Sequence, residues 1–310
     1  MEFQHTSVLL TESVAALVTD KSGVYVDCTM GGAGHSLAIA SLLDPEGHLV
    51  SIDQDPAAIA AGRERLAQAG CKVTVVHDNF RNLNAIFDSL GLDMIDGALF
   101  DLGVSSHQLD TAERGFSYMQ DAPLDMRMDS RQELSAFQIV NMYTEERLEK
   151  VIRDYGEERW ARRIAQFICK ARMHQPLETT GQLVDVIKRA IPAAARREGP
   201  HPAKRTFQAL RIEVNDELGI LRVAFEAAIS RLRPGGRICI ITFHSLEDRI
   251  AKQTLQNLAK SCICPPRLPI CVCNAKPAVK IIGKPLAPTA EELEINPRAR
   301  SAKLRIAQKV

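Results

Sequence analysis

The sequence has 310 residues, of which 45% are hydrophobic and 25% are charged, and its formal net charge is +1. This composition is typical of a soluble globular protein with room for one large domain or two smaller ones. No apolar run is long enough to span a bilayer and no leader pattern opens the chain, so we expect a cytoplasmic protein without a membrane partner. The near-zero net charge confines any nucleic-acid contact to local basic patches.

A short apolar strand around Val24 and Val26 leads into a glycine-rich turn at Gly31 to Gly34, and a helical pattern follows the turn. A second strand, Leu49 to Ile52, ends in Asp53. Asp53 lies about twenty residues beyond the turn, a spacing at which a carboxylate accepts hydrogen bonds from a ribose diol. The pattern predicts a site for an adenosine-bearing cofactor, either a dinucleotide or S-adenosylmethionine.

Two further strands end in polar residues. Lys72 to Val76 is followed by Asp78 and Phe80, which would suit the amino group and the ring of an adenine, or form only a turn with an anchoring aromatic residue. Gly97 to Phe100 is followed by Asp101. Because the carboxyl ends of parallel strands meet at one edge of a sheet, these residues indicate a site there.

Helix caps are predicted at four places along the chain. Thr11 starts a first short helix, and Asp55 followed by a proline starts the helix after the second strand. Ser245 with Asp248 and Thr289 with Glu292 have the spacing of capping boxes.

The alternation of strands and helices stops between residues 110 and 202, where the pattern is helical throughout. We predict an α/β sheet domain formed by 1–109 and 203–310, interrupted by an all-helical insertion at 110–202. The insertion is rich in basic residues, which form either a solvated helix face or a surface that faces phosphates. They include Arg159, Arg162, Arg163, Lys170, Arg172, Lys188, Arg189, Arg196 and Arg197, with Lys204 and Arg205 just beyond.

A long amphipathic helix over Lys204 to Leu232 is expected to return the chain to the sheet, where a fifth strand, Arg237 to Phe243, follows. His244 at its end is either a ligand at the site edge or a satisfied histidine at the edge of the core. The last strand contains Leu304 and Ile306 within a basic stretch that suits an RNA backbone or a charged edge strand.

Four of the eight cysteines form two Cys-x-Cys pairs, Cys262 with Cys264 and Cys271 with Cys273. Such pairs place side chains on one face of an extended segment, where they can meet at a metal or form disulfides. The spacing differs from the usual Cys-x-x-Cys of zinc sites, so a reduced thiol cluster is favoured and no metal site is predicted.

The chain resembles the family of bacterial 16S ribosomal RNA small-subunit cytosine-N4 methyltransferases. The resemblance runs almost from end to end, and Asp101 to Ser106 and Phe243 to Arg249 are its most specific strings. The other matching stretches are His5 to Glu12, Asp27 to Ser36, Glu113 to Ser117, Pro123 to Met128 and Asn296 to Arg305.

The resemblance implies a class I, Rossmann-like methyltransferase sheet that uses S-adenosylmethionine, with the helical insertion recognising RNA. The implied substrate is the exocyclic N4 of cytosine 1402, a decoding-centre cytidine of 16S ribosomal RNA, within an assembled small subunit. The oligomeric state is left open between monomer and homodimer.

Carried onto this chain, the family's cofactor positions fall on seven residues: Ala33, Gly34, His35, Asp53, Phe80, Asp101 and Gln108. Position 33 is alanine where glycine is common, which a backbone contact tolerates if φ is negative. The family resemblance does not extend to the Pro-Pro-aromatic string with which many amino methyltransferases hold their target nitrogen, because Asp101 to Ser106 occupies that place.

The methyl group of a sulfonium is already activated, so in-line geometry matters more than a strong base. Asp101 is the first candidate for binding the N4 hydrogens and receiving the proton, with Ser105, Ser106 and His244 as partners. An unstacked cytosine also requires an apolar wall, expected near Phe116 or Phe243. The alternatives are an NAD-dependent dehydrogenase, suggested by Asp53 and the turn, and a non-catalytic RNA-binding protein, suggested by the basic insertion.

Overall fold

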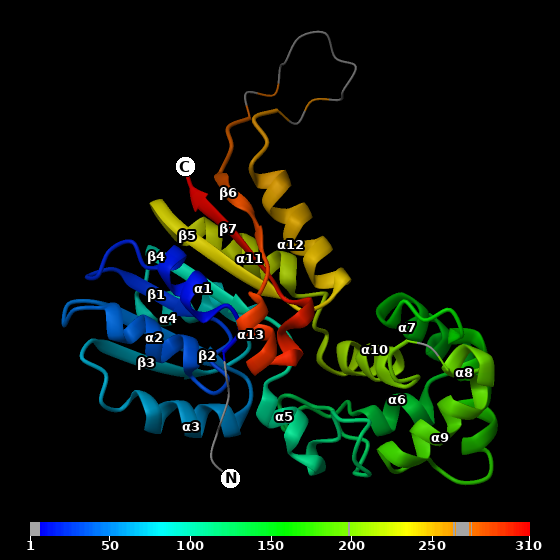
Figure 1. Ribbon diagram of the computed structural model, residues 1–310. Coiled ribbons are helices and arrows are strands. Elements are labelled where there is room, and N and C mark those ends of the chain that lie inside the picture. The colour runs from blue at the N-terminus through cyan, green and yellow to red at the C-terminus, as the bar shows by residue number, and fades with distance from the viewer. Residues whose placement is uncertain (1–6, 198, 263, 265–272, 274) are drawn as a thin grey trace. The chain divides into compact units, whose positions relative to one another are not determined.

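The structure is a computed structural model that describes residues 7–197, 199–262, 264, 273 and 275–310 (Figure 1). The chain divides into a sheet unit, Met1–Gly103 with Leu218–Val310, and a helical unit, Val104–Glu217. Two residues named above, His5 and Cys271, lie outside the described residues. Among the residues that are described, no helix has the length and apolar character needed to cross a membrane.

The sheet unit is built on seven strands in the order β3-β2-β1-β4-β5-β7-β6. They are β1 (Val24–Asp27), β2 (His48–Asp53), β3 (Lys72–His77), β4 (Ile95–Asp101), β5 (Leu232–Thr242), β6 (Val279–Leu286) and β7 (Lys303–Lys309). Strands β1 to β5 run parallel to one another, and β7 is antiparallel to its two neighbours, β5 and β6. The strand order reverses between β1 and β4, where open α/β sheets bind ligands. The predicted Rossmann-like class I methyltransferase sheet is confirmed.

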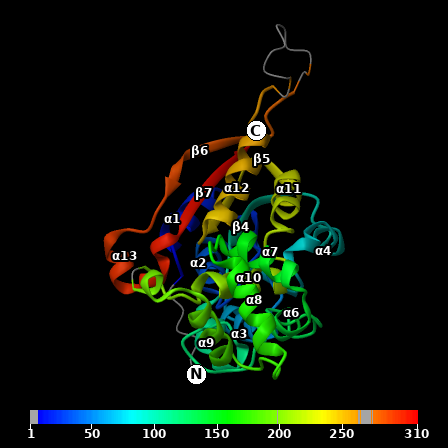
Figure 2. The same ribbon diagram turned by 90° about the vertical axis from the view of Figure 1, so that its right-hand side faces the viewer.

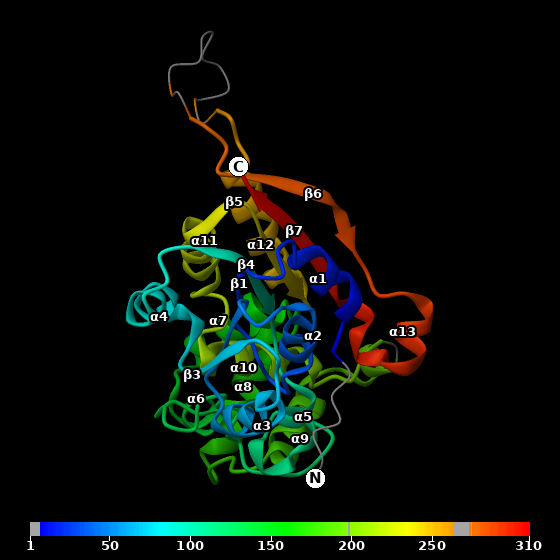
Figure 3. The ribbon, with the colours of Figure 1, turned by 90° about the vertical axis from the view of Figure 1, so that its left-hand side faces the viewer.

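Helices cover both faces of this sheet (Figure 3). Helices α1 (Leu10–Leu17), α2 (Gly34–Leu42) and α3 (Pro56–Leu66) cover one face, and α4 (Leu83–Leu90), α11 (Leu221–Arg231) and α12 (Ser245–Leu258) the other. Successive residues of a strand face opposite sides. Tyr25 and Leu49 therefore pack under the first group of helices, whereas Val26 and Val50 pack under the second. Burial on both faces explains the nearly continuous apolar strands.

The helical unit packs its helices around a core of its own (Figure 2). They are α5 (Ser106–Asp110), α6 (Ala136–Met142), α7 (Glu145–Gly156), α8 (Ala161–Arg172), α9 (Thr180–Ala190) and α10 (Lys204–Asn215). Each long helix buries one stripe: α9, for example, buries Leu183, Val186 and Ile187. Asn215 ties the irregular segment before α6 to α10, because its amide accepts from the Met128 N–H and donates to the Met126 carbonyl, both at 2.8 Å.

The structure corrects the expected helix over Lys204 to Leu232. Two helices, α10 and α11, replace it, because Asp216 adopts a left-handed conformation with φ of 50° that ends α10. Helix α10 packs on α7 and α6 and contributes Phe207 and Leu210 to the core of the helical unit. That unit consequently extends from Val104 to Glu217, beyond the predicted limits of 110 and 202 at both ends.

Two predicted caps at the chain ends differ as well. The N-cap of α1 is Leu9, in a left-handed conformation and without a side-chain cap, rather than Thr11. The Leu9 N–H instead donates to Glu292 Oε1 at 2.7 Å. Thr289 caps α13 (Ala290–Ile295) as expected, since its hydroxyl accepts from the Glu292 N–H at 3.2 Å, but the Glu292 carboxylate is engaged by Leu9.

Gly115 is predicted to be essential for the stability of the helical unit. Its φ is +69°, and a Cβ there would lie 2.2 Å from the Pro123 carbonyl oxygen and 2.9 Å from the Asp125 nitrogen. Both obstacles are backbone atoms that cannot rotate away. We expect Gly115→Ala to lower the free energy of unfolding by about 3 kcal/mol or more.

Urea unfolding followed by fluorescence measures this effect, because the single tryptophan of the chain, Trp160, lies in the helical unit. Gly199→Ala is the matched control: φ is +96°, but no described atom lies within 4 Å of the added Cβ. It should cost about 1 kcal/mol, the price of the backbone conformation alone. Equal losses in the two variants would contradict the role of the backbone contact.

Candidate functional site

Two residues of the turn between β1 and α2 have a positive φ. Gly31 has φ of +49° and Ala33, the N-cap of α2, has φ of 61°. The expectation that alanine is tolerated at position 33 through a negative φ is therefore wrong. Ala33 keeps its left-handed conformation because its N–H donates to the Met30 carbonyl at 2.7 Å and its methyl group is fully buried. Arg65 of α3 also donates to the Gly32 carbonyl, so neighbouring elements fix the turn from two sides.

Asp53 at the end of β2 holds this turn directly. One carboxylate oxygen accepts from the Gly31 N–H at 2.7 Å and the other from the Asp55 N–H at 2.9 Å. Burial raises the pKa of Asp53 to about 6, against the lowering effect of these two hydrogen bonds. A carboxylate has about four lone-pair sites, so Asp53 retains the capacity to accept from ribose hydroxyls.

Asp27 at the end of β1 was not among the predicted site residues. It is fully buried, and it accepts from the Ser36 hydroxyl at 2.6 Å and from the Thr29 N–H at 3.1 Å. Burial raises the pKa of Asp27 to about 6. The same signal that indicated Asp53 and Asp101, a carboxylate directly after a buried strand, would have identified it.

Asp101, at the end of β4, is the third carboxylate at this edge of the sheet, after Asp53 and Asp27. Its Oδ1 is buried and has no hydrogen-bond partner among the described residues, while Oδ2 lies 3.5 Å from His35 Nδ1. Burial raises the pKa of Asp101 well above its usual value, and the nearby charges of Asp27 and Glu247 raise it further. A buried acceptor of this kind is expected where a ligand supplies the missing donor.

His35 connects Asp101 to the N-terminal segment. Its Nε2 lies 3.1 Å from the Val8 carbonyl oxygen, which can only accept, so Nε2 carries the proton in this contact. Nδ1 then faces Asp101 either as an acceptor of the Asp101 proton or as the second donor of an imidazolium. The predicted cofactor residue His35 is thus placed beside Asp101 by a buried, polar contact.

His244 has a structural role that the sequence left open. It is the N-cap of α12: its Nδ1 accepts from the Glu247 N–H at 3.5 Å, and Glu247 accepts in return from the N–H groups of Phe243 and His244. Its Nε2 lies 3.1 Å from Glu247 Oε1, within ion-pair distance but without hydrogen-bond geometry. The capping box is therefore His244 with Glu247, and the predicted box of Ser245 with Asp248 is wrong.

The segment after β3 is a well-formed turn. Asp78 Oδ1 accepts from the Asn79 N–H at 2.7 Å and from the Asn82 side chain at 2.8 Å, and Asn79 caps the short helix that starts at Phe80. Phe80 is half-buried, with its ring edge-on to Phe100 at a centroid distance of 5.7 Å. The Asp78 N–H donates to the Asp53 carbonyl at 3.0 Å, so this turn adjoins the end of β2.

The remaining predicted site residues belong to the helical unit. Ser105 caps α5 and forms a reciprocal capping box with Gln108: the Ser105 hydroxyl accepts from the Gln108 N–H at 3.2 Å, and Gln108 Oε1 accepts from the Ser105 N–H at 3.1 Å. Ser106 is the first residue of that helix. The participation of these three residues in the site of the sheet unit remains a prediction. Phe116 is only 5% exposed and packs in the core of the helical unit, so it is not available as an open wall.

The raised pKa values predict a pH dependence of stability. Asp27 has a folded pKa of about 6 and an ordinary value of 3.8, so its contribution to stability is fully present below pH 3.8 and is lost as the pH rises through 6. Urea unfolding measures the free energy of unfolding of Asp27→Asn relative to that of the wild type. We expect this difference to rise in favour of the variant by up to about 3 kcal/mol between about pH 4 and about pH 7.

Asp93→Asn is the control for this experiment, because the side chain of Asp93 is fully exposed. Its stability difference from the wild type should not change over the same pH range. A difference for Asp27→Asn that is equally flat would show that burial does not perturb Asp27.

A family profile and curated relatives match the chain over almost its whole length. The sequence profile described as the MraW methylase family matches residues 2–310. The chain is 59% identical to "Ribosomal RNA small subunit methyltransferase H" of Clostridioides difficile (strain 630), over 100% of both chains. It is 57% identical to the protein of the same name from Brevibacillus brevis (strain 47), over 100% of this chain and 99% of the relative. A solved structure titled as a putative rRNA-methylase from Clostridium thermocellum has a TM-score of 0.47 at 12% identity, covering 98% of this chain and 99% of that one.

Proposed function

The chain belongs to the MraW methylase family, and from this premise we propose that it methylates the exocyclic N4 of cytosine 1402 in 16S ribosomal RNA of the small subunit, with S-adenosylmethionine as methyl donor. The curated relatives carry the name of a small-subunit ribosomal RNA methyltransferase, which supports the RNA substrate. Because the chain belongs to a methylase family, we reject the alternative of an NAD-dependent dehydrogenase. The observation that carries the proposal is the buried Oδ1 of Asp101, which has no hydrogen-bond partner in the described part of the chain and lies beside the turn held by Asp53.

These residues fit the methyl donor. Asp53 can accept from the ribose hydroxyls, and the backbone of the turn can approach the ligand at the start of α2. The exposed part of Phe80 suits one face of an adenine. S-adenosylmethionine supplies an activated methyl group and positive charge, which the carboxylates of Asp27, Asp53 and Asp101 favour. That charge would also lower the pKa of Asp101, because an opposite charge acts against the raising effect of burial.

Asp101 is the proposed acceptor for the target amine. The lone pair of a cytosine N4 is delocalised into the ring, and an acceptor on its N–H hydrogens localises it. Asp101 Oδ1 would accept such a hydrogen bond and then take the proton released after methyl transfer. A raised pKa favours the second of these tasks, since the carboxylate is a stronger base in a buried site. His35 positions the carboxylate by its contact with Oδ2.

Other predicted catalytic residues receive narrower roles. His244 holds the start of α12 together with Glu247, and we expect it to position Glu247 rather than to contact RNA. Ser105 and Ser106 remain candidates for binding the target base from α5. Phe243, half-buried in the sheet unit, remains the candidate for the apolar wall.

The helical unit is the proposed RNA-binding part of the protein. Arg172 serves its own fold, because it donates to the carbonyls of Val140 and Tyr143 at 2.6 and 2.5 Å. Arg162 and Lys170 of α8 are exposed instead. The proposal does not depend on a second copy of the chain, because all the proposed site residues come from one chain.

We expect Arg162→Gln combined with Lys170→Gln to weaken binding of small subunits. If both side chains face phosphates, the slope of log affinity against log salt should fall by about 1.5 to 2. Arg63→Gln, an exposed arginine of α3 in the sheet unit, is the control and should leave the slope unchanged. Unchanged salt dependence in the double variant would assign these side chains to a solvated helix face.

The experiment that tests the function is transfer of labelled methyl from S-adenosylmethionine to small subunits that lack the modification. Nuclease digestion and nucleoside analysis should recover the label as N4-methylcytidine, and a protected fragment should place it at cytosine 1402. Label in another nucleoside would reject the proposed target. No incorporation by folded protein that binds the subunits would favour a non-catalytic RNA-binding protein.

A further inference from the structure

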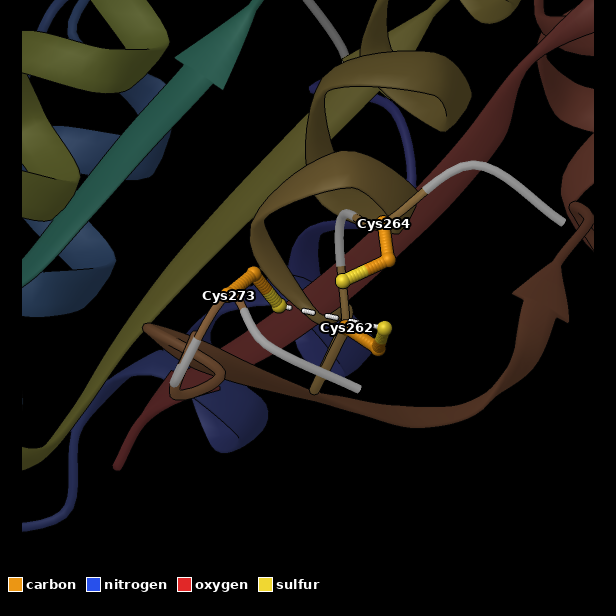
Figure 4. Close-up of side chains that lie close together, drawn as sticks. All are labelled: Cys262, Cys264 and Cys273. Carbon is orange, nitrogen blue, oxygen red and sulfur yellow. Dashed lines mark hydrogen bonds between the residues drawn. The ribbon is translucent and has the colours of Figure 1, made fainter. Parts of the chain in front are cut away.

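Three thiols meet in the segment that joins α12 to β6. The Sγ atoms of Cys262, Cys264 and Cys273 all lie within 4.8 Å of one another (Figure 4). Cys262 and Cys264 follow α12, whereas Cys273 precedes β6, so the cluster brings two separate stretches of chain together. The base of the segment is closed by a hydrogen bond from the Ala278 N–H to the Leu258 carbonyl at 2.7 Å.

The geometry of the cluster is that of metal ligands. Cys262 Sγ and Cys273 Sγ are 3.8 Å apart. Two sulfurs bound at about 2.3 Å to one tetrahedral Zn²⁺ ion are separated by about 3.8 Å. A disulfide would require about 2.0 Å, and it would leave the third sulfur beside the bond without a use.

Burial of small apolar side chains does not explain the cluster. Cysteines that act as core residues are buried, as Cys28 and Cys239 are in the sheet unit. Cys262 is exposed, and Cys264 and Cys273 are only half-buried. Three thiols that converge at the surface, outside every hydrophobic core, need another reason to be together.

We propose that Cys262, Cys264 and Cys273 bind a structural Zn²⁺ ion. Their three thiolates fill three of the four positions of a tetrahedral site, and soft sulfur ligands favour Zn²⁺ over Mg²⁺ or Ca²⁺. On binding, each thiol loses its proton to solvent and forms a bond to the ion. The ion fastens the stretch after α12 to the stretch before β6. The spacing of Cys262 and Cys264 then has a reason, although no metal site was predicted from the sequence.

The test is the zinc content of the full-length protein, purified under reducing conditions, loaded with zinc and dialysed. We expect about one Zn²⁺ per chain by mass spectrometry, and less than about one tenth of that in Cys262→Ser, Cys264→Ser and Cys273→Ser. Cys71→Ser and Cys169→Ser are the controls, since both are half-buried cysteines away from the cluster. They should retain the full zinc content.

Cobalt provides a second measurement that does not depend on protein yield. Co²⁺ added to the wild type should give the thiolate charge-transfer bands and the intense visible bands of a tetrahedral site, and zinc should abolish them. The serine variants should lack these bands, and the unfolding temperature of their hydrophobic cores should match that of the wild type. The proposal would be overturned if the wild type held no zinc after loading and dialysis. Equal metal content in all variants, copper in place of zinc in the purified protein, or a Cys262–Cys273 disulfide that forms in preference to metal binding would overturn it as well.

Discussion

Replacement of Asp101 by asparagine is expected to reduce the maximal rate of methyl transfer to small subunits about 100-fold or more. The asparagine amide can still accept a hydrogen bond, but it cannot take the proton that the methylated amine must lose. The rate should be measured with unmodified small subunits at saturating S-adenosylmethionine, and cofactor affinity should be measured separately by calorimetry. The separation matters because Asp101 is also one of the predicted cofactor residues.

Asp96→Asn is the matched control for this variant. Asp96 lies on the same strand, β4, but at its amino end, where Oδ2 accepts from the Val24 N–H at 2.8 Å. The substitution removes the same charge from the opposite edge of the sheet, and the amide oxygen can still accept that bond. The rate should remain near that of the wild type. If Asp101→Asn transfers methyl groups almost normally once cofactor is saturating, Asp101 positions the cofactor and does not receive the proton.

The second large effect is expected for Asp53→Asn, which should weaken binding of S-adenosylhomocysteine about 100-fold, or by about 3 kcal/mol. Both oxygens of Asp53 accept from backbone N–H groups, those of Gly31 and Asp55. An asparagine must turn its NH₂ group toward one of these donors. It thereby disturbs the glycine-rich turn and also removes acceptor capacity for the ribose hydroxyls.

Asp44→Asn controls for the loss of a turn-forming carboxylate. Asp44 Oδ1 accepts from the N–H groups of Glu46 and Gly47 at 3.1 and 3.2 Å, in the turn before β2, at the opposite end of that strand. Calorimetric titration should give this variant the wild-type affinity, and thermal unfolding should confirm that both proteins are folded. Similar affinities for Asp53→Asn and the wild type would remove Asp53 from the cofactor site.

Much of the sheet unit could be predicted because its local signals agree with its tertiary structure. Asp55 accepts from the Ala57 N–H at 3.0 Å with Pro56 in the first turn of α3, as the sequence indicated. Asp53 and Asp101 lie at the same edge of the sheet, at the ends of β2 and β4 on either side of β1, because parallel strands share a carboxyl edge. Such signals need only the order of residues and the period of the elements.

The structure differs from the predictions where one stretch of sequence allows two local structures. A box with the same spacing can start at His244 or at Ser245, and a tertiary contact favours His244. Asp248 is held by Arg305 of β7, whose Nε donates to Oδ1 at 2.7 Å, so Asp248 is engaged elsewhere. The positive φ of Ala33 could not be predicted for the same reason, since alanine rarely adopts it and the surrounding core imposes it.

The central claim is that the strand ends of β1, β2 and β4 bind the methyl donor, and a crystal structure with S-adenosylhomocysteine tests it most directly. The account predicts ribose hydroxyls within hydrogen-bond distance of Asp53, adenine against Phe80, and a donor group of the ligand on Asp101 Oδ1 or a site beside it that is open to the target amine. A ligand bound away from this edge, with Asp101 Oδ1 still buried and unpartnered, would contradict the account.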